Sequence, residues 1–163
     1  TAACPIVTAG VAVTGHVEAT VTVDAGAVTV TFAFINFVID GYPNITATGS
    51  VTTQGTGALA FAVDVSSPVT FAFSGSVTIS GDTLVVSGTG SYTKDGSTWA
   101  LTLTGVTWKS GDCYPSGGQV SMKTGPVTET LTFTADTAAT GKATLSVGRA
   151  SQEIQLKAYG SCP

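Results

Sequence analysis

Charged residues, histidine and long apolar runs are all scarce in this sequence, and each shortage excludes a class of protein. Charged side chains make up 10% of the 163 residues, against about 25% in an average soluble domain. The six basic residues form no cluster and the formal net charge is −4, so nucleic acid is not an expected partner. The longest apolar stretch, 28–39, is interrupted by Thr29, Thr31 and Asn36, which excludes a membrane-spanning helix of about 20 residues. Association with a membrane in another form stays open.

The residues that most catalytic and metal sites need are also few. His16 is the only histidine, and its neighbour Gly15 predicts that it lies at the tip of a hairpin. No two cysteines have ligand spacing such as C-x-x-C, so no metal site is expected. Aspartates fall mainly at predicted turns, where Asp has a structural use, and no pair of acids is placed for glycosidic chemistry. We therefore expect no catalytic residue, no metal, no cofactor and no enzyme activity.

Small residues are abundant instead. Thr, Val, Gly, Ala and Ser account for 104 of the 163 residues, and in TETLTFT (128–134) threonine fills every second position. Such alternation is typical of a β-strand, because successive side chains point to opposite faces. Threonine suits a solvated strand face, but a face of small uncharged groups can also pack closely against another sheet or subunit. A third interpretation is a regular row of hydroxyls, as in the T-x-T arrays of ice-binding β-proteins.

The same alternation recurs along the whole chain and predicts its fold. Turn sequences such as DAGA (24–27), SGD (80–82) and KDGS (94–97) divide the alternating segments. We predict an all-β protein, an antiparallel meander of about 11–12 strands that forms a β-sandwich or an up-and-down β-barrel. The chain is expected to be one domain over 1–163. Its main meander spans about 6–109, and a cysteine-containing loop with shorter strands, which fit a cap or second sheet, spans 110–163.

Three cysteines, Cys4, Cys113 and Cys162, leave one unpaired within the chain. We predict a disulfide between Cys113, in a loop rich in Gly and Pro, and Cys162, because that bridge would hold the C-terminal segment in place. Cys4 is then a spare thiol or bridges to another chain. Disulfides persist mainly in oxidising compartments, so the expected location is outside the cell or at its surface.

Two stretches carry a resemblance: GDCYPSGGQVSM (111–122) and ETLTFTADTAATGKATLSVG (129–148). They resemble exported Thr/Gly/Val-rich β-proteins of bacteria, among them predicted lipoproteins, which have a Cys–Tyr/Arg–Pro–Ser–Gly loop followed by short Thr/Val strands. FINFVIDGY (34–42) and YTKDGSTWALTLTGVTW (92–108) are similar in character. The resemblance implies a location in the bacterial envelope or outside the cell, and it implies no activity. The composition is also similar to that of bacterial surface-fibre subunits.

The function that these observations favour is structural. We expect a structural or assembly protein of the bacterial cell surface or extracellular space, such as a fibre (filament) subunit that associates with its own copies. The N-terminal segment alternates in PIVTAGVAVT (5–14) and can add as a strand to its own sheet or to that of a neighbour. The candidate residues for contact between subunits are therefore Cys4, Val7, Ala9, Val11 and Val13.

Two alternatives remain. One is a β-barrel module that binds a hydrophobic small molecule or lipid, because barrels of about eight strands can enclose one ligand. Its candidate hydrophobic interior consists of Phe32, Phe34, Phe61, Phe71, Phe73 and Trp99. The weakest alternative is an outer-membrane barrel, for which two Trp and four Tyr make poor aromatic girdles.

Overall fold

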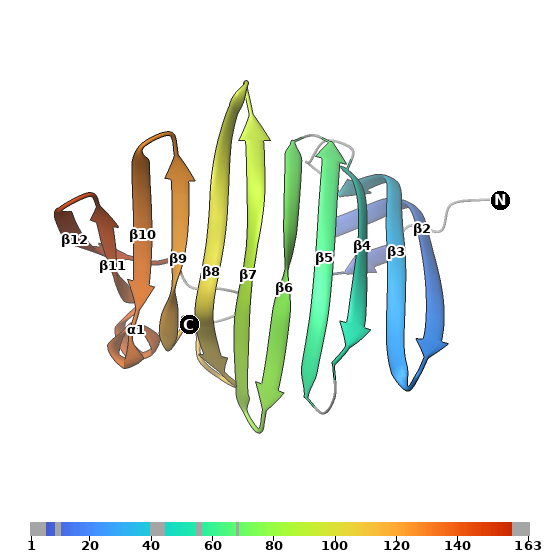
Figure 1. Ribbon diagram of the computed structural model, residues 1–163, viewed down its shortest axis with the longest axis horizontal. Coiled ribbons are helices and arrows are strands. Elements are labelled where there is room, and N and C mark those ends of the chain that lie inside the picture. Colours follow the sequence, from blue (N-terminus) through green and yellow to red (C-terminus); the bar gives the residue numbers. More distant parts are fainter. Residues whose placement is uncertain (1–5, 9–10, 40–44, 55–56, 68, 158–163) are drawn as a thin grey trace.

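One antiparallel sheet contains every strand of the computed structural model, which describes residues 6–8, 11–39, 45–54, 57–67 and 69–157. The strands follow one another in sequence order across the sheet (Figure 1). Their bounds are β1 Ile6–Thr8, β2 Val11–Asp24, β3 Ala27–Ile39, β4 Ile45–Thr53, β5 Ala58–Ser67, β6 Thr70–Ser80, β7 Thr83–Lys94, β8 Ser97–Lys109, β9 Gly117–Thr124, β10 Val127–Phe133, β11 Lys142–Val147 and β12 Ala150–Gln155. Among the described residues one short helix, α1 (Ala135–Thr140), lies between β10 and β11.

The predicted all-β antiparallel meander is therefore confirmed, with twelve strands. The sheet is not closed into a barrel: within the described residues, β1 pairs only with β2 and β12 only with β11. The shorter strands after residue 110 continue the same sheet through the pairing of β8 with β9, so they form neither a cap nor a second sheet. Short hairpins keep consecutive strands adjacent, which explains why the meander continues to its last strand.

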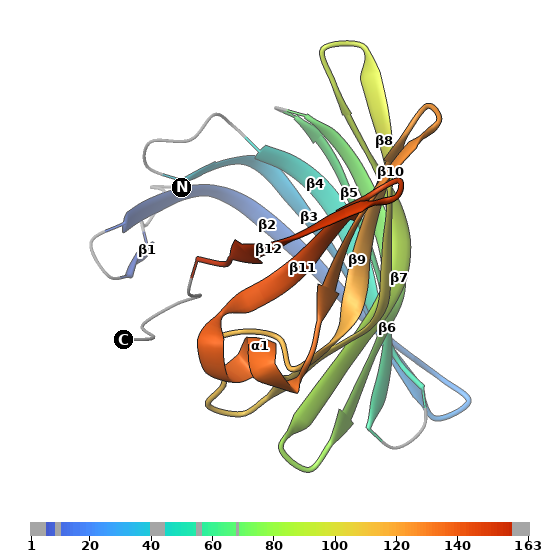
Figure 2. The ribbon, with the colours of Figure 1, turned by 90° about the vertical axis from the view of Figure 1, so that its left-hand side faces the viewer.

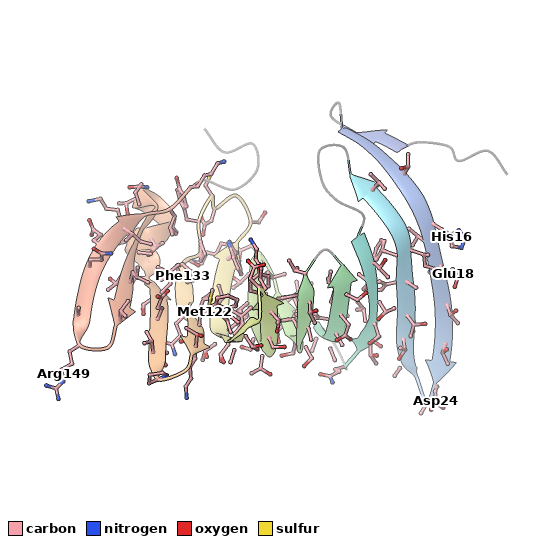
Figure 3. The ribbon with its side chains drawn as sticks, turned by 90° about the horizontal axis from the view of Figure 1, so that it is seen from above. His16, Glu18, Asp24, Met122, Phe133 and Arg149 are labelled. Carbon is pink, nitrogen blue, oxygen red and sulfur yellow. The ribbon has the colours of Figure 1, made fainter. Side chains whose placement is uncertain are left out.

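The sheet is strongly curved, and its two faces differ in chemistry. Figure 2 shows the strands bowed around a concave side, on which α1 and the loop after β8 lie. Apolar residues occupy the concave face, and Thr and Ser occupy most of the convex face, as the cross-strand registers show for Val30 opposite Val51 and Thr31 opposite Ser50. Figure 3 places Phe133 on the inner side and His16 with Glu18 on the outer side.

A bulge in β8 keeps the apolar face continuous. The apolar residues of this strand change parity at Gly105, from Leu101 and Leu103 before it to Val106 and Trp108 after it. Gly105 has a φ of 56°, its N–H donates to Ser87 Oγ at 2.9 Å, and the register with β7 shifts at this point. One extra residue reverses the direction of the side chains that follow. The bulge therefore returns Val106 and Trp108 to the concave face.

Three of the four buried apolar residues of the described part lie at the C-terminal end of the sheet, and the fourth is Ala47 in β4. Val106 is 1% exposed and Phe133 is 7% exposed, and together with Ala143 they form the core cluster. Leu103, Trp108, Val120, Leu131 and Leu156 pack against it. The loop 110–116 is held over this end because the N–H of Ser116 donates to Thr107 O at 2.7 Å and that of Ser110 donates to Asp82 O at 2.8 Å.

Helix α1 was not predicted, because six residues are too few to show a 3.6-residue period. Thr134 precedes it in an extended conformation, and its N–H donates to Oγ1 of Thr137, which is 1% exposed. Gly141 ends it at a φ of 71°, and its N–H donates to Thr137 O at 2.8 Å. The buried Thr137 thus stabilises both ends of this turn.

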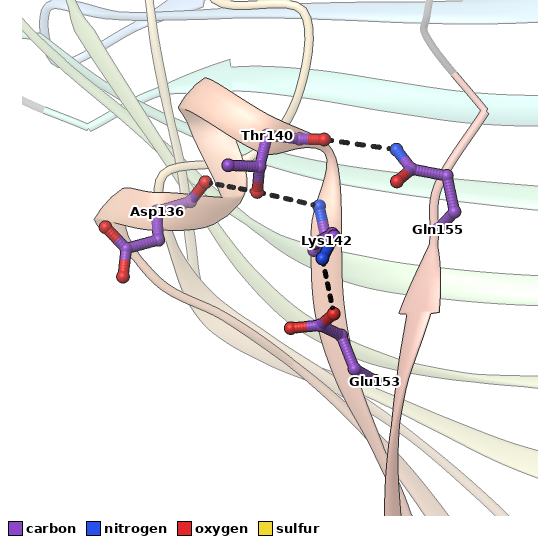
Figure 4. Close-up of polar contacts among 5 residues, drawn as sticks. All are labelled: Asp136, Thr140, Lys142, Glu153 and Gln155. Atoms are coloured by element: carbon purple, nitrogen blue, oxygen red, sulfur yellow. Dashed lines mark hydrogen bonds and ion pairs between the residues drawn. The ribbon is translucent and has the colours of Figure 1, made fainter.

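Polar contacts join α1 to the two strands that follow (Figure 4). Thr140 Oγ1 donates to Asp136 O at 2.7 Å and accepts from the N–H of Lys142 at 3.2 Å. Gln155 Nε2 donates to Thr140 O at 3.1 Å, and Lys142 Nζ lies 2.8 Å from Glu153 Oε1. The helix, β11 and β12 are therefore tied together at the edge of the sheet.

Candidate functional site

The concave face over β2–β7 is apolar and remains open. We call this surface the open apolar face. Its aromatic side chains form contacts with one another: Phe61 stacks on Phe73 with ring centroids 5.5 Å apart, and Phe71 stacks on Phe73 at 6.2 Å. Phe32 meets Phe34 edge to face at 5.4 Å. These rings are half-buried.

Glycines lie beneath two of these rings. A Cβ at Gly49 would lie 2.5 Å from the Cζ of Phe32, and one at Gly88 or Gly90 would lie within 3 Å of the ring of Phe73. The rings therefore cover the glycine backbone on the neighbouring strands, as aromatic residues often do in sheets. The result is a shallow apolar surface, continuous across strands, with no second layer of the described residues above it.

The six residues predicted as a hydrophobic interior all lie on this concave face. Phe32, Phe34, Phe61, Phe71 and Phe73 belong to the open apolar face, and Trp99 extends it onto β8, where it contacts Tyr92 at 5.4 Å. All six are half-buried. They line an exposed surface and not the inside of a barrel, because the sheet does not close.

A cavity of about 650 Å³ lies at the other end of the concave face. Its floor comes from β7, β8 and β10 and its cover from the loop after β8 and the segment after β12. The lining residues are Leu84, Val86, Trp108, Asp112, Cys113, Tyr114, Pro115, Leu131, Phe133, Leu156 and Lys157. The sequence offered one signal for this site, the CYP stretch shortly after Trp108, but the parity change at Gly105 obscured the shared face.

The convex face carries an ordered row of hydroxyls, which we call the hydroxyl row. Eleven residues, one from each of β2–β12, are directly paired across the sheet, and ten of them are Thr or Ser. They are Thr20, Thr31, Ser50, Ala62, Ser74, Thr89, Thr102, Ser121, Thr130, Ser146 and Ser151. Alternation alone could not predict that these residues share one register. Ice-binding arrays need a flat surface, so the curvature in Figure 2 counts against that interpretation.

Few charges interrupt the convex face. Glu18 and Asp64 line one shallow hollow of about 420 Å³, but they lie three strands apart, about 14 Å at ordinary strand spacing. Paired carboxylates of glycosidases are about 5–9.5 Å apart. His16 lies in β2 opposite Ile35 and beside a register shift, so the prediction of a hairpin tip was wrong, because Gly15 marks a bulge. Its Nε2 lies 3.1 Å from Glu18 Oε1.

Cys113 is disulfide-bonded. Both other cysteines, Cys4 and Cys162, lie outside the described residues, so the Cys113–Cys162 pairing stays a prediction. Of the predicted contact residues, Val7 lies in β1, which pairs with β2 of the same chain opposite Ala12. Val11 and Val13 lie in β2, and Ala9 is outside the described residues. Contact between subunits through this segment also stays a prediction.

The titratable side chains of the described residues offer little chemistry on either face of the sheet. Within the described ranges, no three residues of the types His, Cys, Asp and Glu gather closely enough to hold a metal ion. The pKa of Lys142 is raised by its hydrogen bond with Glu153 and by the charge of that carboxylate. In the part of the chain that the structure describes, no helix is long and apolar enough to cross a membrane.

Comparison with protein-family models, with curated proteins and with solved structures finds no match to this chain.

Proposed function

We propose that the protein is a structural subunit of the bacterial cell surface or extracellular space that assembles with its own copies into filaments. The observation that carries this proposal is the open apolar face. Exposed apolar surface of this extent marks an interaction site in a soluble protein, and on β2 the side chains of Val17 and Val21 are 49% and 63% exposed.

The area available is large enough for a stable contact. The chain has an accessible surface of 10295 Å², whereas a folded monomer of its mass exposes about 7,400 Å². The excess, roughly 2,800 Å², belongs to the whole molecule, both faces of the sheet included, and is comparable with the area of about 2,000–5,000 Å² that obligate interfaces bury in total. A second copy can therefore supply the cover that the chain's own fold leaves out.

The curvature of the sheet favours a contact that can be repeated from copy to copy. Two concave surfaces meet only at their rims, but a concave face fits the convex face of the next copy. That contact joins two different surfaces, so it is repeated from copy to copy and builds a filament when the rotation does not close a ring. The hydroxyl row suits it because small uncharged side chains allow close approach and little charge must leave water. Some hydroxyls already bond to each other, such as Thr29 with Thr52 at 2.9 Å.

The proposed location is supported by the disulfide at Cys113, because such bonds persist mainly in oxidising compartments. The low content of charged residues, 10%, also fits a subunit whose surface is largely covered in an assembly. A free-standing domain usually keeps charges on its strand faces and edges.

Size measurement of variants with matched charges tests the proposal. Val17→Glu with Val21→Glu places two carboxylates on the open apolar face, and Thr20→Glu with Thr22→Glu places two on the convex face of the same strand. All four side chains are exposed, so each change costs little folding stability. Ser97→Glu, at an exposed hairpin position, is the control. We expect filaments from the intact chain and the control, and monomers from both double variants, by electron microscopy and light scattering.

Mixing the two double variants gives the sharpest result. Each keeps one intact surface, so an equimolar mixture is expected to form dimers and nothing longer. If only the Val17→Glu, Val21→Glu variant fails to assemble, the contact joins two apolar faces, and the proposal of a filament is wrong. If the intact chain is monomeric, or both double variants assemble normally, self-association through these faces is refuted.

A further inference from the structure

The cavity beneath the loop 110–116 meets the open apolar face at Leu84 and Val86 of β7, but its cover comes from the same chain. At about 650 Å³ it lies within the range of small-molecule sites, about 300–1,000 Å³. A methylene group needs about the volume of a water molecule, roughly 30 Å³, so the volume suffices for one acyl chain. Its lining is mainly aliphatic and aromatic, including Leu84, Trp108 and Tyr114.

The cavity is held open by contacts on each of its sides. The loop is fixed at its start by the N–H of Asp112, which donates to Lys109 O at 3.0 Å, and at its end by Ser116. Tyr114 lies against Gly141, where an added Cβ would be 2.6 Å from its ring. The N–H of Leu156 donates to Gly141 O at 2.8 Å. Because these backbone anchors prevent the cover from collapsing onto the sheet, the site is preformed, as ligand sites usually are.

Two charged residues of opposite sign complete the lining. Asp112 and Lys157 both border the cavity, and Lys157 is exposed to solvent. Because the two charges are opposite in sign, their attraction and repulsion offset each other for an anionic or a cationic head group. A neutral head with hydroxyls satisfies both, because it can donate to Asp112 and accept from Lys157. We infer that the cavity binds a single-chain lipid with a neutral polar head, its acyl chain against Trp108 and its head near Asp112 and Lys157.

The two tryptophans of the chain make this inference testable. Trp108 borders the cavity, whereas Trp99 lies nine residues earlier at the other end of β8, about 30 Å away at strand rise. The Trp99→Phe variant leaves Trp108 as the only tryptophan, and Trp108→Phe leaves Trp99. The probe is a monoacylglycerol with bromine at the middle of its acyl chain, used below its aggregation concentration, because bromine quenches only a tryptophan that it contacts.

The expected result is loss of most Trp108 fluorescence with saturable dependence on probe, and little loss from Trp99. Val86→Phe, made in the Trp99→Phe background, fills the cavity and is expected to weaken binding at least about tenfold. Val30→Phe, the same change on the open apolar face, is the control and leaves quenching unchanged. Circular dichroism checks that both variants fold. Equal quenching of both tryptophans, no quenching of Trp108, or equal binding by both valine variants would overturn the inference.

Discussion

The two ends of the sheet consist of different strands with the same alternation of residues, but only one of them has a cover. Over β8–β11 the concave face is closed by the loop 110–116, by α1 and by Leu156, and it contains the buried residues Val106, Phe133 and Ala143. Over β2–β7 the apolar residues are equally regular, yet among those with described side chains only Ala47 is buried. Alternating apolar residues make one face of the sheet apolar, but that face becomes a core only where a second layer of the chain covers it.

The difference assigns different uses to the two ends. The covered end can fold by burying its own side chains, so its stability belongs to the single chain. The open end gains that burial only from another molecule, which is why we place the contact between copies there. The cavity lies at the covered end. There the hydrogen-bonded loop 110–116 holds a space between itself and the sheet, whereas the aromatic rings of the open end enclose no such space.

Replacing one phenylalanine at each end is expected to give the largest contrast. Phe133→Ala removes a ring that is 7% exposed and should lower the free energy of unfolding by about 3–5 kcal/mol. Phe73→Ala removes a half-buried ring and should cost about 1–2 kcal/mol. Both are measured by urea denaturation at a concentration at which the chain is monomeric. Equal losses would show that the open end is covered in the single chain as well.

Alanine substitution at two glycines with positive φ compares the same two ends, with smaller expected losses in the free energy of unfolding. Gly141→Ala should lower the free energy of unfolding by about 2–3 kcal/mol, because the methyl group meets Tyr114 in addition to the backbone strain. Gly26→Ala, in the β2–β3 hairpin, has a φ of 84° but no atom within 4 Å of the new Cβ, so strain alone should cost about 1 kcal/mol. A thermal or urea melt of each gives the difference, which is due to the contacts with Tyr114 and with the side chain of Gln155. If Gly26→Ala costs as much, the loop does not press on Gly141.

The ion pair at the edge of the sheet should have the smallest effect. Glu153→Gln removes the charge that helps to raise the pKa of Lys142 and leaves only a neutral acceptor for its hydrogen bond, so that pKa should fall toward its ordinary value, as followed by nuclear magnetic resonance of the lysine side chain. A raised pKa in the folded state stabilises below the ordinary lysine pKa, and this contribution is lost as the pH rises through the raised value. Because both side chains are more than half exposed, the melting temperature at neutral pH should barely change. A large drop would mean that β11 and β12 depend on this pair.

Particular residues show how far the sequence alone could be interpreted. Alternation in the segments 17–24 and 28–34 predicted both strands and their apolar faces, because strand periodicity is a local property of the chain. In the sequence, the parity change at Gly105 looks the same as the end of one strand and the start of another. A bulge depends on pairing with a neighbouring strand, here on the hydrogen bond to Ser87, and a local pattern does not contain that pairing. The position of α1 also depended on tertiary contacts, because six residues form a helix only when a buried side chain such as Thr137 stabilises them.

The sequence by itself determined that the chain forms strands, that they pair with their neighbours in order, and that one face is apolar and the other rich in hydroxyls. These follow from backbone sterics, short turns and alternation, which act over a few residues. Only the tertiary structure decided that the sheet stays open, that the hydroxyls of eleven strands come into one register except at Ala62, and that one end of the concave face is covered. Those features depend on curvature and on contacts between Tyr114, Gly141 and Leu156, which no local pattern contains.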